Sequence, residues 1–141
     1  MIIRRANVED APAIASLAGE LGYPVEPDTM RARLGPVLRS EDDAVFVGVA
    51  GMAVIGWAHV AAVRLVESEP YAELRGLVVA AALRSRGAGT RLLHAAEEWT
   101  RSRGLARIRV RSNVTRERTH AFYERHGYTA TKSQKVFDRQ L

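Results

Sequence analysis

The segment spanning residues 78–93 carries the clearest chemical signal in the chain. It opens with an apolar, β-branched run typical of a strand, passes through residues 84–89 (RSRGAG), and continues with the apolar spacing of a helix. A strand that turns through glycines into a helix leaves backbone N–H groups without partners at the helix start, where the helix dipole adds positive charge. The pattern therefore predicts an anion site that suits phosphate.

Two glycines and three arginines of this segment suit a phosphate ligand. Gly87 and Gly89 have no Cβ, so an oxyanion can approach the backbone closely. Arg84, Arg86 and Arg91 add full positive charges, and a guanidinium group matches the geometry of phosphate. A glycine-rich turn with solvated arginines is the alternative that stays open on the local pattern alone.

Two well-known nucleotide-binding loops fit this segment poorly. A mononucleotide P-loop has four residues between its glycines and then Gly-Lys-Ser/Thr, and the chain has neither feature. The dinucleotide fingerprint needs a third glycine or alanine three residues after the second, where this chain has Leu92. Both nucleotide interpretations are therefore disfavoured.

Apolar periodicity predicts the elements that position the loop. We expect strands at 1–5, 44–50, 52–66, 71–79 and 106–112, helices at 8–21, from 28 or 29 to about 38, 89–103 and about 116–126, and one or two strands within 128–141. The order is β-α-α-β-β-β-α-β-α-β(-β). Such an order predicts an α/β (α+β) fold with a mixed, mostly antiparallel sheet flanked by helices, and disfavours a doubly wound nucleotide fold.

Local signals support these boundaries. Asn7 suits the N-cap of the first helix, with Asp10 in its first turn, and Gly22 suits its end. Gly51 lies between two strand patterns and predicts a hairpin. Gly76 falls in the middle of a predicted strand, which indicates a β-bulge or a close backbone approach.

Composition predicts one compact domain that covers residues 1–141. The chain is 47% hydrophobic and 26% charged, has no apolar run long enough to span a bilayer, and begins without a signal-peptide core, so we expect a cytoplasmic protein with no membrane partner. The absence of cysteine excludes disulfides and thiolate metal sites. The four histidines lack metal-ligand spacing, and we expect no metal.

Charge is distributed unevenly along the chain. Residues 1–83 hold 7 Lys/Arg against 11 Asp/Glu, whereas residues 84–141 hold 14 against 5. The basic half suits a phosphate-rich cofactor, since its positive charge begins at the anion loop. Nucleic acid is a less favoured partner because only 6% of the residues are aromatic and stacking side chains do not alternate with the arginines of residues 107–111. The remaining alternative is that the arginines of the basic half are ordinary surface residues that bind no ligand.

Two separated motifs resemble those of the GNAT superfamily of N-acetyltransferases. Arg84, Gly87 and Gly89 fill the family's Gln/Arg-x-x-Gly-x-Gly/Ala loop, which holds the pyrophosphate of acyl-CoA. Asn113 and residues 121–128 (AFYERHGY) resemble its Asn…Ala-x-x-Tyr…Gly-Phe/Tyr signature, although the alanine lies two residues before Tyr123, a departure from the commonest spacing. The element order also matches the GNAT arrangement over essentially the whole chain.

The resemblance implies acetyl-CoA as acyl donor and assigns roles to particular residues. Tyr123 would be the general acid that protonates the departing sulfur, and Asn113 would bind the cofactor arm. Glu73 is the candidate general base, directly or through water. The cofactor would lie against a strand end and the loop that follows it: Leu77, Val78, Val79, Arg84, Ser85, Arg86, Gly87, Ala88, Gly89 and Thr90. Each residue also has a purely structural alternative: Tyr123 as a packed core side chain, Glu73 as a solvated strand residue and Asn113 as a turn residue.

The acceptor is less defined than the donor. Tyr23, Trp57 and His59 are weak candidates for substrate contacts, and packing explains each of them at least as well. Acidic residues near the first two helices favour a cationic acceptor, a primary amine of a small molecule or of a protein. A domain that binds acyl-CoA without catalysis is the alternative function. Relatives often dimerise, so a homodimer that uses the C-terminal strands is a further expectation.

Overall fold

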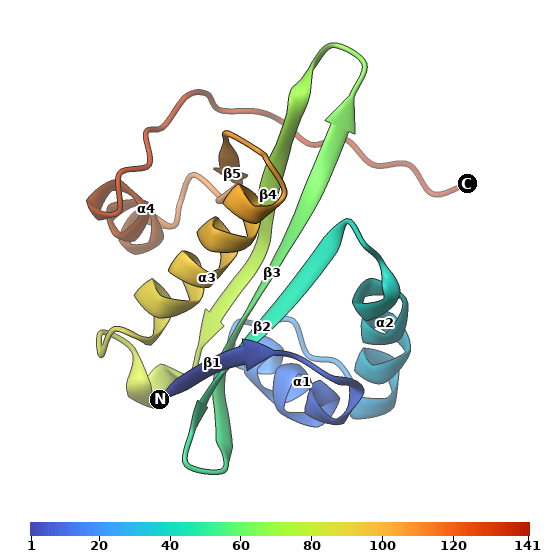
Figure 1. Ribbon diagram of the computed structural model, residues 1–141, viewed down its shortest axis with the longest axis vertical. Helices are drawn as coiled ribbons and strands as arrows, with labels where there is room; N and C mark the ends of the chain where they lie inside the picture. The colour runs from blue at the N-terminus through green and yellow to red at the C-terminus, as the bar shows by residue number, and fades with distance from the viewer. The chain divides into compact units, whose positions relative to one another are not determined.

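The computed structural model describes residues 1–141 and contains two compact units, residues 1–110 and 111–141. The first unit is built on a five-stranded sheet (Figure 1) with the order β1-β2-β3-β4-β5. Its strands are β1 Ile2–Arg5, β2 Asp43–Ala50, β3 Ala53–Leu65, β4 Ser68–Val79 and β5 Ile108–Val110. The first four strands pair antiparallel and β5 joins β4 in parallel. The sheet is therefore mixed and mostly antiparallel, as the sequence predicts.

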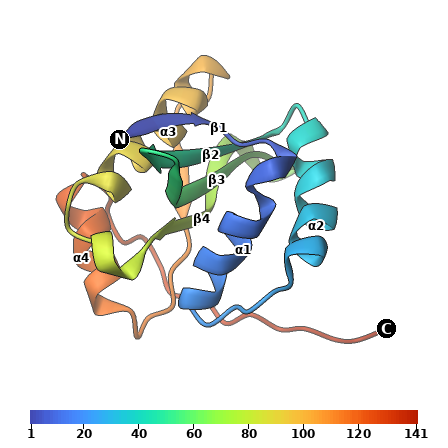
Figure 2. The same cartoon turned by 90° about the horizontal axis from the view of Figure 1, so that it is seen from below.

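Three helices of the first unit cover both faces of the sheet. They are α1 Ala11–Glu20, α2 Pro27–Arg39 and α3 Ala88–Ser102. Figures 1 and 2 show α1 and α2 on one face and α3 on the opposite face. None of the helices has the length and apolar character needed to cross a membrane.

Strand alternation produces one buried layer on each face. On the side of α1 and α2, Val45 and Val47 of β2 pack with Ile14 and Leu34. On the other side, Leu92 of α3 lies beside Gly48 and Gly56, whose missing side chains leave room for it. Burial of these valines and leucines supplies the main stabilisation, at about 1.5–3 kcal/mol per fully buried side chain.

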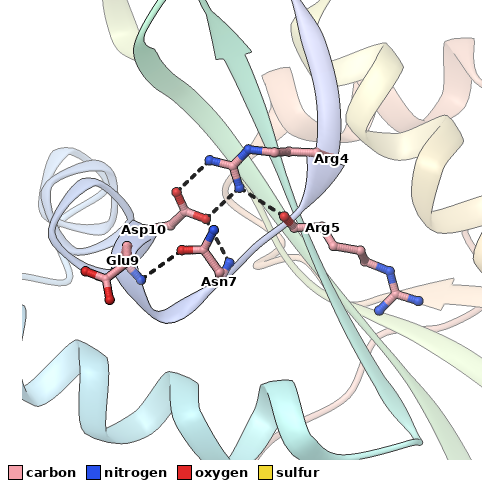
Figure 3. Close-up of polar contacts among 5 residues, drawn as sticks. All are labelled: Arg4, Arg5, Asn7, Glu9 and Asp10. Carbon is pink, nitrogen blue, oxygen red and sulfur yellow. Dashed lines mark hydrogen bonds and ion pairs between the residues drawn. The ribbon is translucent and has the colours of Figure 1, made fainter.

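The short turn before α1 is tied to β1 by a network of polar side chains (Figure 3). Asn7 caps a 3₁₀ turn, η1 Val8–Asp10, by accepting the N–H of Glu9, while Asp10 accepts the N–H of Asn7 at 2.8 Å. Arg4 donates two hydrogen bonds of 2.8 Å to the same carboxylate. The Arg4 guanidinium and the hydrogen bonds it donates hold the pKa of Asp10 below its usual range.

Several boundaries differ from the sequence-based expectation. Strand β4 begins at Ser68, not at Tyr71, and Asn7 caps a separate 3₁₀ turn, so that α1 begins only at Ala11. Helix α2 begins at Pro27, not after a cap at Asp28 or Thr29, because proline has the φ angle of a first helical position and needs no N–H partner there. Helix α3 begins at Ala88, so Gly89 lies inside its first turn. Strand β5 covers three residues and not 106–112, because its ladder with β4 ends after Val110.

The second unit contains helix α4, Glu117–Arg125, which ends where Gly127 adopts a φ of 88°. Within it Tyr123 is buried and Ala121 is exposed.

The prediction of one or two final strands within 128–141 is wrong, since these residues form neither helix nor strand. A strand needs a partner edge for its backbone, and Phe137 of this segment is 87% exposed. The homodimer expected from those strands stays a prediction, which light scattering of the purified protein tests.

We predict that Asp10→Asn lowers the free energy of unfolding by about 2 kcal/mol, because it removes the charge that pairs with Arg4 and weakens the cap. Denaturant unfolding at neutral pH measures the loss. The folded pKa of Asp10 lies below its ordinary value of 3.8. The stabilisation is therefore present above that value and is lost as pH falls through the folded pKa. The gap between wild type and variant should therefore close in acid.

Glu9→Gln is the matched control. Glu9 carries the neighbouring carboxylate, but its side chain makes only a 3.6 Å surface contact with Arg31. Its stability should lie within ~0.5 kcal/mol of wild type. Equal losses for the two variants would contradict the role assigned to the Arg4–Asp10 pair.

Candidate active site

The connection from β4 to α3 has the backbone geometry of an anion loop. After a short 3₁₀ turn, η2 Ala81–Leu83, Ser85 adopts a φ of 65° and Gly87 a φ of 86°. Gly87 is the N-cap of α3, and a Cβ on it would meet nothing within 4 Å. The first-turn N–H groups of α3 have no intrahelical acceptor and therefore suit a negatively charged oxygen. The left-handed Ser85 is a strained position of the kind found in functional loops.

The loop arginines divide between structure and solvent. Arg84 donates through Nε to the carbonyl of Val79 at 3.3 Å, so it ties the loop to the end of β4. Arg91 donates to the carbonyl of Met1 at 2.6 Å. Arg86 is exposed and makes no polar contact within the protein. Its charge is therefore available to a ligand without any rearrangement.

A contact that the sequence did not reveal holds the start of this loop. The carboxylate of Glu20, the last residue of α1, accepts the N–H of Ala81 at 3.0 Å. The interaction joins elements 61 positions apart in the chain. A glutamate at a helix end is common, and only the packing of α1 against the sheet gives this one its partner.

Strand β4 has an open edge next to the loop. Strand β5 pairs with Ala72–Leu74 and with no later residue of β4. Ala80 donates its N–H to Ile55 of β3, so strand alternation directs the N–H groups of Leu77 and Val79 away from β3, toward the open edge. These two N–H groups can stabilise a negative charge that develops beside the strand, whereas the N–H of Val78 points to β3.

Gly76 satisfies both sequence-based expectations for a mid-strand glycine. Register shifts where His59 pairs with Gly76 and Val60 with Leu74, so Arg75 is an extra residue in a β-bulge. A Cβ on Gly76 would lie 2.5 Å from the ring of Trp57. The indole thus fills the space of the missing side chain.

Trp57 and His59 lie side by side on the face covered by α1 and α2. Trp57 packs against the buried cluster there, and its Nε1 is buried without a hydrogen-bond partner. His59 Nε2 lies 2.7 Å from Asp43 Oδ1. Tyr23 is 73% exposed on the connector between α1 and α2. The structure therefore assigns packing to most of Trp57 and leaves Tyr23 at the surface.

Glu73 shares this face through the strand register. Asp43 pairs with Ala61, which in turn pairs with Glu73, so the two carboxylates flank the same residue of β3. Glu73 Oε1 lies 3.6 Å from Arg75 Nε, and its side chain is largely buried. The candidate base is therefore part of a polar group on the sheet and is not a solvated surface glutamate.

Two arginines of the predicted basic strand face have a structural partner. The guanidinium carbons of Arg107 and Arg109 lie 4.8 and 4.9 Å from the ring centroid of Tyr71. A cation above an aromatic face is attracted by its quadrupole. These charges cover a buried ring, which weakens the case for a nucleic-acid surface.

In the second unit, Tyr123 is 8% exposed and packs near Phe122 and Tyr128, with ring centroids 5.2 and 5.5 Å away. Burial raises the pKa of Tyr123 to about 12, and the positive charge of Arg116 acts weakly in the opposite direction. The phenol is therefore fully protonated near neutral pH and can donate a proton. It cannot act as a base there.

Asn113 lies in the turn before α4. Its Oδ1 accepts the N–H of Thr115 at 3.0 Å and the Thr115 hydroxyl at 2.9 Å. The side-chain oxygen is thus used by the turn, as the structural alternative expects. The Nδ2 amide is the part of Asn113 that can donate to a ligand.

Comparison with known proteins gives consistent matches over nearly the whole chain. The model of the acetyltransferase (GNAT) family matches residues 11–128. Aminoglycoside N(6')-acetyltransferase type 1 of Stenotrophomonas maltophilia is 31% identical over 144 residues, covering 99% of this chain and 93% of that protein.

Two solved structures share the fold. Aminoglycoside 6'-N-acetyltransferase AAC(6')-IG of Acinetobacter haemolyticus has a TM-score of 0.86 at 18% identity, covering 100% of this chain and 99% of the other. Aminoglycoside N-acetyltransferase AAC(6')-Iy, solved in complex with CoA, has a TM-score of 0.88 at 20% identity, covering 99% and 95%. At this identity the likeness concerns the fold alone, and it confirms the fold expected from the sequence.

We predict that Gly76→Ala lowers the free energy of unfolding by about 1–3 kcal/mol, because its methyl group would overlap the Trp57 ring. Thermal and denaturant unfolding measure the loss. Gly19→Ala is the matched control, since a Cβ there meets nothing within 4 Å and alanine is the better helix former. A Gly76→Ala protein as stable as wild type would contradict the close approach of the indole.

Proposed function

Since this chain belongs to the acetyltransferase (GNAT) family and is an acetyl-CoA-dependent N-acetyltransferase, we propose that its acceptor is a primary amine of a cationic small molecule of the aminoglycoside class. The observation that carries the mechanism is the open edge of β4, where the N–H groups of Leu77 and Val79 point outward next to the anion loop. The substrate class is supported by the relative that is 31% identical over 99% of the chain.

The loop between β4 and α3 fits the phosphates of the donor. The open space at Gly87, the first-turn N–H groups of α3 and the exposed Arg86 form a cradle for a diphosphate. Ser85, Ala88, Gly89 and Thr90 complete the proposed contacts, and Arg84 holds the loop against β4. When bound, acetyl-CoA supplies an acetyl thioester.

The chain's own groups would then serve three chemical needs. The N–H groups of Leu77 and Val79 are placed to stabilise an oxyanion, and removal of one such contact typically costs ~10²–10³ in kcat. Glu73 is the proposed base at the amine, directly or through water. Tyr123 is the proposed acid for the departing sulfur, and Asn113 is proposed to bind the cofactor arm.

A cationic acceptor suits the charges of the first unit. Glu26, Asp28 and the run of residues 41–43 lie at the ends of α2, and Glu73 lies on the sheet face that α2 helps to cover. Negative charge attracts a polyamine and raises its local concentration. A protein amino group is the broader class to which the same chemistry applies.

We predict that wild-type protein binds acetyl-CoA with micromolar affinity and that Arg84→Glu/Gly87→Asp weakens binding by about 10² or more, because two negative groups replace phosphate contacts. Isothermal titration measures both. Arg86→Glu should weaken binding as well, and it disturbs no contact within the protein.

Arg101→Glu is the matched control, since it makes the same charge change at the far end of α3. Its affinity should stay near that of wild type. If wild-type protein binds no acetyl-CoA, the proposed role of the loop is overturned. If the protein acetylates a lysine peptide but no aminoglycoside, the acceptor is a protein amino group.

We predict that Tyr123→Phe lowers kcat by about 10²–10⁴ and leaves the affinity for acetyl-CoA unchanged, because the variant keeps the ring and loses the proton donor. Thiol release in a steady-state assay measures kcat. Tyr128→Phe removes a hydroxyl from the neighbouring ring and should be nearly silent. If kcat is unchanged in Tyr123→Phe, Tyr123 contributes packing and is not the general acid.

A further inference from the structure

The face of the sheet beneath α1 and α2 holds a His–Asp pair near the proposed reaction centre. His59 Nε2 and Asp43 Oδ1 are 2.7 Å apart, and the two side chains are only 21% and 16% exposed. His59 pairs across β3–β4 with Gly76, at the bulge where β4 separates from β5. The imidazole therefore lies on the strand next to the oxyanion segment of β4.

The pair orients the imidazole and selects the tautomer of its neutral form. An ionised carboxylate can only accept, so His59 donates Nε2–H to Asp43, and in the neutral imidazole Nδ1 then carries the lone pair. The hydrogen bond of His59 goes through Nε2, so Nδ1 is left for a ligand. A histidine oriented by a carboxylate is the arrangement of a general base.

The other charged groups on this face have different partners. Glu73 Oε1 lies 3.6 Å from Arg75 Nε, so its carboxylate already has a cationic neighbour. Arg109 pairs in register with Glu73 and lies over the Tyr71 ring. Among these groups His59 is the one that combines an available lone pair with a fixed orientation.

We propose that His59 Nδ1 accepts the proton that the acceptor amine loses during acetyl transfer. In this assignment Asp43 is a positioning residue, and Glu73 supplies the negative charge that draws the ammonium form of the amine to the face. The assignment rests on the proposed function and deepens it, since it moves the proton from a carboxylate to an imidazole.

The step balances without any further reactant. The bound ammonium first releases one proton to water, which gives the neutral amine its lone pair. The amine nitrogen then forms a C–N bond with the acetyl carbon as the C–S bond breaks, and the sulfur leaves with a proton from Tyr123. The proton lost by the amine goes to His59 Nδ1. Both side chains return to their starting states by exchange with water before the next turnover.

The test compares His59→Gln, Asp43→Asn and Glu73→Gln with wild type. We expect His59→Gln to lower kcat by ~10² or more while the affinity for acetyl-CoA is kept, as for loss of a general base. Asp43→Asn should lower kcat by about tenfold or more, because the amide can hold the wrong tautomer. Added imidazole should restore part of kcat in His59→Ala, which a purely structural histidine would not allow.

Nitrogen NMR of the imidazole gives a readout that needs no turnover. Wild-type His59 should show a protonated Nε2 and an unprotonated Nδ1, and Asp43→Asn should lose this preference. A protonated Nδ1 in wild-type protein near neutral pH would overturn the assignment whatever the activity.

The kinetic outcomes separate this proposal from the function on which it rests. Wild-type protein that binds acetyl-CoA but acetylates neither aminoglycosides nor a lysine peptide overturns the proposed function, and this assignment with it. If the wild-type protein is active, His59→Gln keeps its kcat and Glu73→Gln lowers it, only the assignment to His59 is overturned. Glu73 would then be the group that accepts the proton. Loss of activity in His59→Ala without rescue by imidazole, matched by a loss of stability, also overturns it.

Discussion

The short pairing between β4 and β5 is the constraint on which the site depends. Only Ala72–Leu74 are hydrogen-bonded to β5, and β4 then continues for five more residues with one edge open. An unpaired strand edge is normally a liability, because its N–H and C=O groups seek partners. Here the open N–H groups lie directly before the loop between β4 and α3, and in the proposed function this unpaired edge receives the thioester.

The bulge in β4 organises the opposite face. Arg75 is the extra residue, and Gly76 beside it lets the Trp57 ring approach the backbone. The large indole packs against the core under α1 and α2. One glycine thus links the bulge in the strand to the packing of the core.

The two faces of the sheet divide the chemistry between them. The face of α3 presents the helix N-terminus and the loop that suit phosphates. The face of α1 and α2 presents Asp43, His59 and Glu73, which suit an amine. In the proposed reaction, a donor and an acceptor that approach from different sides would meet at the edge of β4, so neither ligand would have to displace the other.

The sequence by itself determined the parts of the molecule that depend on neighbours along the chain. The strand–loop–helix pattern around Gly87, the cap at Asn7, the hairpin at Gly51 and the family all follow from local spacing and turn chemistry. The anion loop was predictable because helix termini and positive φ angles are local properties.

Only the tertiary structure decided which distant groups meet. The partners Glu20–Ala81 and Asp43–His59 lie 61 and 16 positions apart, and each forms through strand register or helix packing that no short pattern encodes. The expected final strands failed for the same reason, since 128–141 has strand-like composition but no edge to pair with in its own unit. Backbone hydrogen bonds of a sheet are made between segments, so composition gives a strand's propensity, and the availability of a partner decides whether it forms.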